Sequence, residues 1–276
     1  MNSVHNLLQN AYHILRKANV PSAENDAQLL LAELMGTSKL QLILMQNELV
    51  SDSIYIQYQQ YIKQRANRKP LQHILGYTYF YGSKIKVNSS VLIPRPETEL
   101  LCERAIQYIG TKAFAVLDLC TGSGCIAITL AKNCINANIT AIDISTEALR
   151  LAQKNANKEA VNIHFVQNNL MQNLQNVFDV IVSNPPYVKT SDIACLEPEV
   201  KQDPVLALDG GTDGLDLITN IIAQCETNLK TDGVLMLEIG HDQSALVKEL
   251  LQDKFYNIEI LQDYCEYNRF VIAYKK

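Results

Sequence analysis

The segment Asn184-Pro185-Pro186-Tyr187 has residue types that could hold a planar NH2 group, and it begins at the last residue of the apolar run 179–184. Two prolines fix the backbone angle φ and remove two N–H donors, so the segment presents carbonyl oxygens and one side-chain amide. The Asn184 side-chain oxygen and the Pro185 carbonyl can each accept one N–H bond, and Tyr187 can pack on the reacting group. A surface turn is the alternative, because Asn-Pro pairs are common in turns. The position at the end of a buried strand favours a ligand site.

A glycine-rich turn, Cys120-Thr121-Gly122-Ser123-Gly124, follows the apolar run 115–119. Gly122 and Gly124 let the backbone turn tightly and approach a ligand, and the helix expected from Cys125 to Lys132 would present N–H groups at its start. A GxG pair alone is weak support, and a tight strand-to-helix turn without a ligand is the alternative. The turn therefore gains meaning only beside the other motifs.

The second apolar run, 138–144, carries Asp143 near its end, nineteen residues beyond Gly124. An acidic side chain there commonly accepts hydrogen bonds from a ribose, because two vicinal hydroxyls can share one carboxylate. The alternative role is a helix N-cap, since a helix begins at Ser145-Thr146-Glu147 and Asp caps helices well. Ser145 is better placed to cap that helix, so we interpret Asp143 as the ribose acceptor.

Seven strand-sized apolar runs must position these motifs. The first five alternate with helical segments, which indicates parallel strands buried on both faces. The last two are separated by too few residues for a helical crossover, so they should pair antiparallel at one edge. The sequence therefore predicts an α/β fold with a doubly wound, mostly parallel, seven-stranded sheet. The runs span 115–119, 138–144, 162–167, 179–184, 233–240, 256–262 and 268–274.

The N-terminal residues have a different pattern, with apolar residues at helical spacing and with start and stop signals such as Ser51 and Gly36. We divide the chain into a helical substrate-recognition domain (1–70), a hairpin linker (71–92) and a catalytic α/β domain (93–276). The linker interpretation rests on alternating apolar residues around Gly82-Ser83.

Charge also separates the N-terminal part from the rest. Residues 1–80 hold seven Lys or Arg against five Asp or Glu, although the whole chain has a net charge of −5. Four of these cations, Lys63, Arg65, Arg68 and Lys69, cluster at the end of the helical domain. We expect this cluster to contact a partner, and the alternative is a solvated helix end whose cations favour the helix dipole.

Composition excludes several protein classes. A net charge of −5 and a pI of about 5.6 argue against a dedicated nucleic-acid-binding protein, and no apolar run reaches the length of a membrane span. The first 17 residues have neither the basic start nor the apolar block of a signal peptide, so we expect a cytoplasmic protein. Seven cysteines without a CxxC spacing indicate reduced core thiols and no metal site. We expect a monomer.

Together, the turn 120–124, Asp143 and Asn184–Tyr187 resemble the class I S-adenosylmethionine-dependent methyltransferases that methylate a planar NH2 nitrogen. Further motifs make residues 70 to 276 similar to the bacterial release factor glutamine methyltransferases of the PrmC/HemK type, with a compatible helical N-terminal domain. So many separate matches are specific to one family. They are Leu71–Gly76 (LQHILG), Val91–Glu99 (VLIPRPETE), Ile181–Tyr187 (IVSNPPY), Glu197–Val200 (EPEV), Ala207–Gly214 (ALDGGTDG) and Leu237–Gly240 (LEIG).

The resemblance implies N5-methylation, by S-adenosylmethionine, of the glutamine in the Gly-Gly-Gln motif of class I peptide chain release factors. The expected product of the cofactor is S-adenosylhomocysteine, and no direct nucleic-acid or membrane partner is implied. The family's cofactor site falls on Cys120, Thr121, Gly122, Ser123, Gly124, Asp143, Asn169, Leu170 and Asn184. Its substrate site falls on Asn184, Pro185, Pro186 and Tyr187, of which Asn184, Pro185 and Tyr187 are the expected catalytic residues.

Two positions depart from the family pattern. Cys120 stands where the family usually has glycine, so the loop must accept a Cβ atom there. Where the family commonly has an Asp followed by an aromatic residue near adenine, this chain has Asn169-Leu170. Asn169 can still bond an adenine edge, and Leu170 can still pack on the ring.

Three other functions remain open from the residues themselves. An adenine-N6 methyltransferase acting on DNA or RNA uses a similar Asn-Pro-Pro-aromatic motif, but it would need a basic surface for phosphates. An NAD-dependent oxidoreductase would explain the turn at 118–124 and leave Asn184–Tyr187 without a role. A binding module without activity is the third, and the intact motifs argue against it.

Overall fold

The computed structural model describes residues 2–276, and these divide into two compact units. The first comprises the chain up to Tyr77 together with the distant segment Glu197–Gln202. The second comprises Thr78–Leu196 and Asp203–Lys276. The chain therefore leaves the second unit once, soon after the Asn184–Tyr187 motif, to add six residues to the first.

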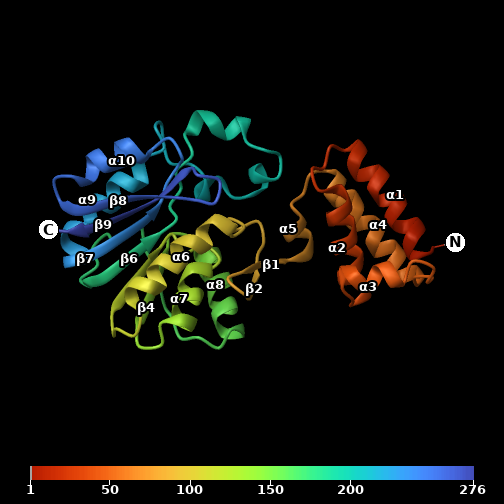
Figure 1. Ribbon diagram of the computed structural model, residues 1–276, viewed down its shortest axis with the longest axis horizontal. Coiled ribbons are helices and arrows are strands. Elements are labelled where there is room, and N and C mark those ends of the chain that lie inside the picture. Colours follow the sequence, from red (N-terminus) through yellow and green to blue (C-terminus); the bar gives the residue numbers. More distant parts are fainter. Residues whose placement is uncertain (1) are drawn as a thin grey trace. The chain divides into compact units, whose positions relative to one another are not determined.

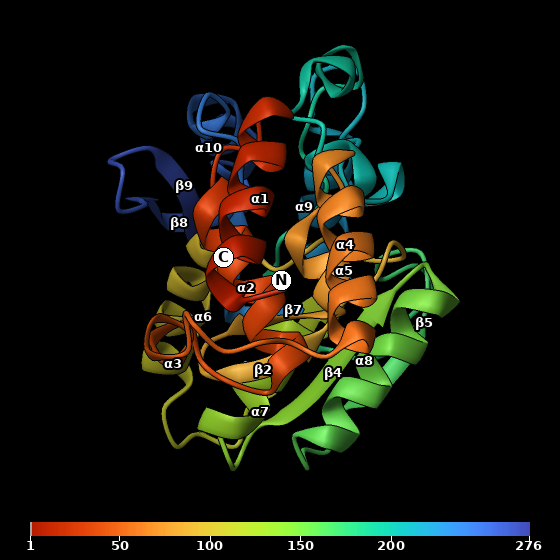
Figure 2. The same ribbon diagram turned by 90° about the vertical axis from the view of Figure 1, so that its right-hand side faces the viewer.

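Five helices form the first unit, and serine caps begin several of them. Ser51 accepts a hydrogen bond from the backbone N–H of Ile54, and Gly36 ends the second helix in the left-handed conformation (φ +62°), as predicted. The long helices α1, α2 and α4 lie beside one another, as Figure 2 shows. Their apolar side chains form one buried core. The helices are α1 (Val4–Lys17), α2 (Ala23–Met35), α3 (Lys39–Leu44), α4 (Asp52–Ala66) and α5 (Leu71–Leu75).

The segment predicted as a hairpin from residue 71 begins with a helix instead. Pro70 stands at the N-cap of α5, Gly76 ends it at φ +79°, and Ile74 is buried in the helical core. A helix of five residues is unstable in isolation, so α5 depends on its tertiary contacts. Burial of Ile74 in the helical core supplies such a contact. The hairpin itself is present and shorter, with β1 (Tyr77–Phe80) paired to β2 (Ser83–Lys86).

The predicted seven-stranded, mostly parallel sheet with an antiparallel edge is confirmed. The strand order is β5-β4-β3-β6-β7-β9-β8, and β9 pairs antiparallel with both β7 and β8. β7 begins four residues earlier than predicted, because the buried Leu229 pairs with Phe178 of β6 before a shift in the register. The strands are β3 (Ala115–Leu119), β4 (Asn138–Asp143), β5 (His164–Gln167), β6 (Phe178–Ser183), β7 (Leu229–Glu238), β8 (Phe255–Gln262) and β9 (Asn268–Lys275).

Helices cover both faces of this sheet, as Figure 1 shows. One buried cluster joins the sheet to α6, α7 and α8, and a second joins it to α9 and α10. Within residues 2–276, none of the helices is long and apolar enough to cross a membrane. These helices are α6 (Pro96–Ile109), α7 (Cys125–Asn133), α8 (Thr146–Lys158), α9 (Asp216–Asn228) and α10 (Ser244–Leu251).

The register of the three central parallel strands brings the predicted motifs together. Leu119 of β3 lies opposite Ile142 of β4 and Ser183 of β6. The loops that follow these residues therefore leave the sheet at the same edge, which is where open α/β sheets bind ligands.

The expectation that the cysteines are core residues is wrong for two of the seven. All seven carry free thiols, and Cys195 and Cys265 are exposed.

Candidate functional site

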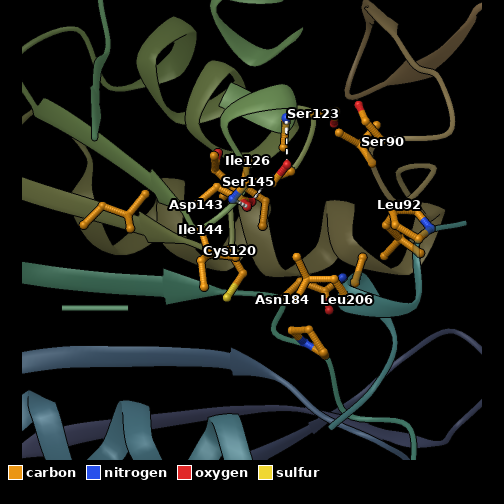
Figure 3. A pocket seen from close by; sticks show the side chains of 18 of the residues that line it. Ser90, Leu92, Cys120, Ser123, Ile126, Asp143, Ile144, Ser145, Asn184 and Leu206 are labelled. Atoms are coloured by element: carbon orange, nitrogen blue, oxygen red, sulfur yellow. Dashed lines mark hydrogen bonds between the residues drawn. The ribbon is translucent and has the colours of Figure 1, made fainter. Parts of the chain in front are cut away.

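A cavity of about 440 Å³ opens at the carboxyl ends of β3, β4 and β6 within the second unit. Figure 3 shows Asp143, Ile144 and Ser145 on one side, Ser90 and Leu92 on the other, and Asn184 and Leu206 between them. Most of the predicted site residues line it: Cys120, Thr121, Gly122, Ser123, Asp143, Asn169, Leu170, Asn184 and Pro186. The remaining three, Gly124, Pro185 and Tyr187, are not lining residues.

The turn between β3 and α7 explains the place of Gly124. Gly124 has φ +81°, and a Cβ atom added there would lie 3.0 Å from the Cβ atom of Ala152 on α8. Gly124 therefore allows α7 and α8 to pack closely. Cys120 also takes the left-handed conformation (φ +58°), which costs a residue with a Cβ atom about 1–2 kcal/mol. The loop accepts the Cβ atom at that cost.

Asp143 is tied to the neighbouring loop and does not cap a helix. Its Oδ2 atom accepts from the Gly122 N–H at 2.8 Å, and its Oδ1 atom accepts from the Ser145 N–H at 2.9 Å. Ser145 is the N-cap of α8, and its hydroxyl accepts from the Ala148 N–H at 3.2 Å. Burial raises the pKa of Asp143, and the backbone N–H bonds oppose that effect. The carboxylate is thus held at the cavity wall beside the glycine-rich turn.

Asp118 lies fully buried beneath the same turn. Its Oδ2 atom accepts from the Thr121 hydroxyl at 2.5 Å and from the Ala127 N–H at 3.1 Å, which ties the turn to the first turn of α7. Its Oδ1 atom has no hydrogen-bond partner among the described residues. Burial raises the pKa of Asp118 to about 7.

Asn184 stands at the start of a chain of side-chain hydrogen bonds. Its Nδ2 atom donates to the Thr98 hydroxyl at 3.1 Å, and that hydroxyl donates to Glu238 Oε2 at 2.7 Å. The Tyr187 hydroxyl donates to Glu238 Oε1 at 3.3 Å, so the polar end of Tyr187 is engaged by a buried carboxylate. Tyr187, which was predicted to pack on a reacting group, is not among the residues that line the cavity.

A single side chain, Gln243, fixes the backbone behind Asn184–Tyr187. Its Nε2 atom donates to the Tyr187 carbonyl at 3.0 Å and to the Gly214 carbonyl at 3.1 Å. Its Oε1 atom accepts from the Gly240 N–H at 2.8 Å. Gln243 is buried, so these bonds are shielded from water. Three separate motifs of the sequence meet at this residue.

The sequence alone did not assign roles to Thr98, Glu238 or Gln243. Glu238 carried a usable signal, because it is a lone carboxylate at the end of the apolar run 233–240. A charge in that position is costly unless it is paired or used. Thr98 and Gln243 gave no such signal, since their partners lie far along the chain.

The wall near β5 carries the two residues that depart from the family pattern. Asn169 and Leu170 both line the cavity, and Leu170 is buried with φ +52°. An amide and an aliphatic side chain thus stand where a planar heterocycle could be bonded at its edge and covered on its face.

Two of the four cations of the basic cluster at the end of the helical unit are paired with carboxylates within that unit. Arg65 is buried and donates to Asp26 and Glu199, each at 2.8 Å. Arg68 donates two bonds to Glu199, both at 2.6 Å. Burial alone would raise the pKa of Glu199, but the Arg68 and Arg65 hydrogen bonds outweigh it and lower the pKa to about 2. Half of the predicted contact surface is therefore used to hold Glu197–Gln202 in the first unit.

Comparison with known proteins assigns the chain to a family. Residues 6–76 match the PrmC N-terminal domain, and residues 97–197 match the methyltransferase small domain. The release factor glutamine methyltransferase of Thermodesulfovibrio yellowstonii is 38% identical over 91% of this chain and 92% of its own length, and that of Deinococcus radiodurans is 36% identical over 97% and 96%. A methyltransferase structure from Pyrococcus furiosus shares the fold (TM-score 0.57, 16% identity, 77% of this chain and 98% of that chain). The chain belongs to the release factor glutamine methyltransferase family.

Proposed function

We propose that this chain transfers a methyl group from S-adenosylmethionine to the side-chain nitrogen of the glutamine in the Gly-Gly-Gln motif of class I peptide chain release factors. The observation that carries the proposal is the Asn184 amide on the cavity wall, whose Nδ2 atom donates a hydrogen bond to the Thr98 hydroxyl oxygen. The other end of that amide is an acceptor, which suits a substrate NH2 group. Family membership supports the same reaction.

The cavity fits the cofactor in size and in chemistry. Its volume of about 440 Å³ lies within the range of about 300–1,000 Å³ common for small-molecule sites. Asp143 would hold the ribose hydroxyls, the turn Cys120–Gly124 would allow close backbone approach, and Asn169 with Leu170 would contact the adenine. When bound, S-adenosylmethionine would supply an electrophilic sulfonium methyl group, and the sulfur–methyl bond would break to leave the neutral thioether S-adenosylhomocysteine.

The protein's own task is to orient the glutamine amide. An amide nitrogen is a poor nucleophile because its lone pair is delocalised into the carbonyl. Asn184 Oδ1 would accept one N–H bond, and the resemblance assigns the second to the carbonyl of Pro185, a buried residue that is not among those lining the cavity. These two bonds would direct the nitrogen toward the methyl group. These bonds strengthen as positive charge grows on the nitrogen, so they favour the transition state over the ground state.

No general base is required for this transfer. The methylated, N-protonated amide is strongly acidic and loses its proton to water. The carboxylate bonded within this network, Glu238, is buried and receives hydrogen bonds from Thr98 and Tyr187. It is therefore placed to hold other side chains and not to accept the substrate's proton directly.

The helical unit would supply the recognition surface for the release factor. Its short helix α3 exposes Leu40, Ile43 and Leu44, with 73%, 58% and 84% of each residue accessible. Neighbouring exposed apolar side chains of this kind favour contact with another protein. This surface replaces the basic cluster as the expected contact region, because Arg65 and Arg68 are paired within the unit.

The test uses the full chain, methyl-labelled S-adenosylmethionine and a purified class I release factor. We expect label on the release factor, with mass spectrometry placing one methyl group on the glutamine of Gly-Gly-Gln. A release factor with that glutamine replaced by alanine is the control and should take up no label. Label on nucleic acid, or on another residue of the release factor, would contradict the proposal.

A further inference from the structure

The Asn184 side chain can serve a substrate NH2 group in only one of its two orientations. Its Oδ1 atom accepts hydrogen bonds, whereas its Nδ2 atom donates them and would face a second donor. The two orientations have nearly the same shape, so packing alone does not select between them. A polar neighbour must hold the amide with its oxygen toward the substrate.

The Thr98 hydroxyl is that neighbour, and its single proton is already committed. Thr98 Oγ1 donates to Glu238 Oε2 at 2.7 Å, so only its lone pairs remain for Asn184. Asn184 Nδ2 donates to Thr98 Oγ1 at 3.1 Å. If the amide turned over, Asn184 Oδ1 would face the lone pairs of Thr98 Oγ1, and both oxygens would repel.

Glu238 sets the direction of the Thr98 proton. An ionised carboxylate only accepts, and the two Glu238 oxygens accept from Thr98 and from the Tyr187 hydroxyl. Glu238 is 1% exposed and Thr98 is 2% exposed, so water does not compete for these bonds. Burial raises the pKa of Glu238 to about 7, and the Thr98 hydrogen bond and the charge of Arg269 oppose that rise, so the direction given for the Thr98 proton belongs to the ionised form that predominates above that pH.

We propose that Thr98 is a positioning residue for glutamine methylation, and that its hydroxyl, oriented by Glu238, holds the Asn184 amide with the oxygen toward the substrate nitrogen. The inference rests on the proposed function, because the orientation matters only for a substrate that presents an NH2 group. Thr98 acts on the reaction through Asn184. Thr98 itself lines the cavity, but its hydroxyl proton is donated to Glu238.

Two substitutions of Thr98 separate this role from simple packing. Thr98→Val keeps the branched shape and removes the hydroxyl, whereas Thr98→Ser keeps the hydroxyl and removes the methyl group. A positioning role predicts that Thr98→Val lowers kcat on release factor about tenfold, the effect of losing one hydrogen bond. It predicts that Thr98→Ser retains kcat within about twofold. A packing role predicts the reverse order, because the smaller side chain leaves a void.

The experiment measures kcat and KM on a class I release factor, together with S-adenosylmethionine affinity by calorimetry and thermal unfolding. We expect Thr98→Val to lower kcat more than it raises KM and to leave cofactor affinity within about twofold. In an Asn184→Ala background, Thr98→Val should have no further effect on kcat, since the residue acts through Asn184. Should the valine variant not fold, Thr98→Ala and Thr98→Ser form a second pair that differs only in the hydroxyl.

Failure of the positioning role and failure of the proposed function give different results. Equal kcat for Thr98→Val and the unaltered chain, or a larger loss for Thr98→Ser, would overturn the positioning role while the proposed function stands. A full loss from Thr98→Val in the Asn184→Ala background would overturn it as well. Absence of glutamine methylation by the unaltered chain would overturn the proposed function and this inference together.

Discussion

Replacement of Gly214 by alanine tests how closely the loop at 210–214 must approach the Asn184–Tyr187 motif. Gly214 has φ +79°, and a Cβ atom added there would lie 2.4 Å from the Tyr187 carbonyl oxygen and 2.6 Å from Gln243 Nε2. Gly82 in the β1–β2 turn has nearly the same φ, +77°, but nothing lies within 4 Å of its added Cβ atom. Gly82→Ala is therefore a matched control, with the same backbone strain and no contact.

Gly214→Ala should lower the unfolding free energy more than Gly82→Ala does. Left-handed backbone costs an alanine about 1–2 kcal/mol, and this applies to both positions. At Gly214 the Tyr187 oxygen must also move by about 1 Å to restore ordinary contact at 3.4 Å. That displacement breaks the two Gln243 bonds to Tyr187 and Gly214, worth about 1 kcal/mol each. We expect unfolding free energy to fall by about 3–4 kcal/mol for Gly214→Ala and by about 1–2 kcal/mol for Gly82→Ala.

Activity should separate the two variants further. A shift of about 1 Å at the residues that orient the substrate can lower kcat by about 10²-fold. Urea unfolding followed by circular dichroism gives the stabilities, and methylation of a release factor gives kcat. Gly82→Ala should keep the unaltered kcat. If the two variants lose the same stability and the same kcat, Gly214 has no role in placing Tyr187, and the reasoning is refuted.

Three further predictions concern carboxylates. Asp143→Ala should weaken S-adenosylmethionine and S-adenosylhomocysteine alike, by about 10–100-fold, because both contain the ribose; calorimetry showing unchanged affinity would exclude that role. Glu199→Gln should lower the unfolding free energy at pH 7 and much less near pH 2. The folded-state pKa of about 2 means that the stabilisation from pairing with Arg65 and Arg68 is complete above about pH 4.5 and is lost as the pH falls toward 2. Urea titrations at both pH values measure the difference, and an equal loss at both would contradict the prediction. Asp118→Asn should raise the unfolding free energy relative to the unaltered chain, by an amount that grows from about pH 4 to 7. The folded-state pKa of about 7 lies above the ordinary value, so ionising Asp118 destabilises the fold in that range. Urea titrations across that range measure the difference, and a difference independent of pH would contradict this.

The sheet was predictable because each strand is a continuous apolar run of strand length. Runs such as 115–119 and 179–184 agree with the observed strands within one residue, since burial on both faces leaves few polar positions inside a strand. The helix α5 was not predicted, because five residues are too short to show a period. Its Ile74 becomes informative only once the helical core is known.

The contacts behind the site could not be predicted from local sequence. Thr98 and Glu238 are 140 residues apart, and Arg65 and Glu199 are 134 residues apart. Such pairs depend on which strand edges and helix ends the fold brings together. The residues at strand ends were predictable for the opposite reason, because the carboxyl ends of neighbouring parallel strands always meet at one edge.

The central claim is that the Asn184 amide orients the glutamine nitrogen for methyl transfer. The most direct test is Asn184→Ala, with kcat measured on a class I release factor and S-adenosylmethionine affinity measured on the same protein. We expect kcat to fall by about 10²–10³, because one preorganised acceptor of the reacting amide is removed, and cofactor affinity to stay within a few-fold. A folded variant with nearly unaltered kcat would contradict the claim.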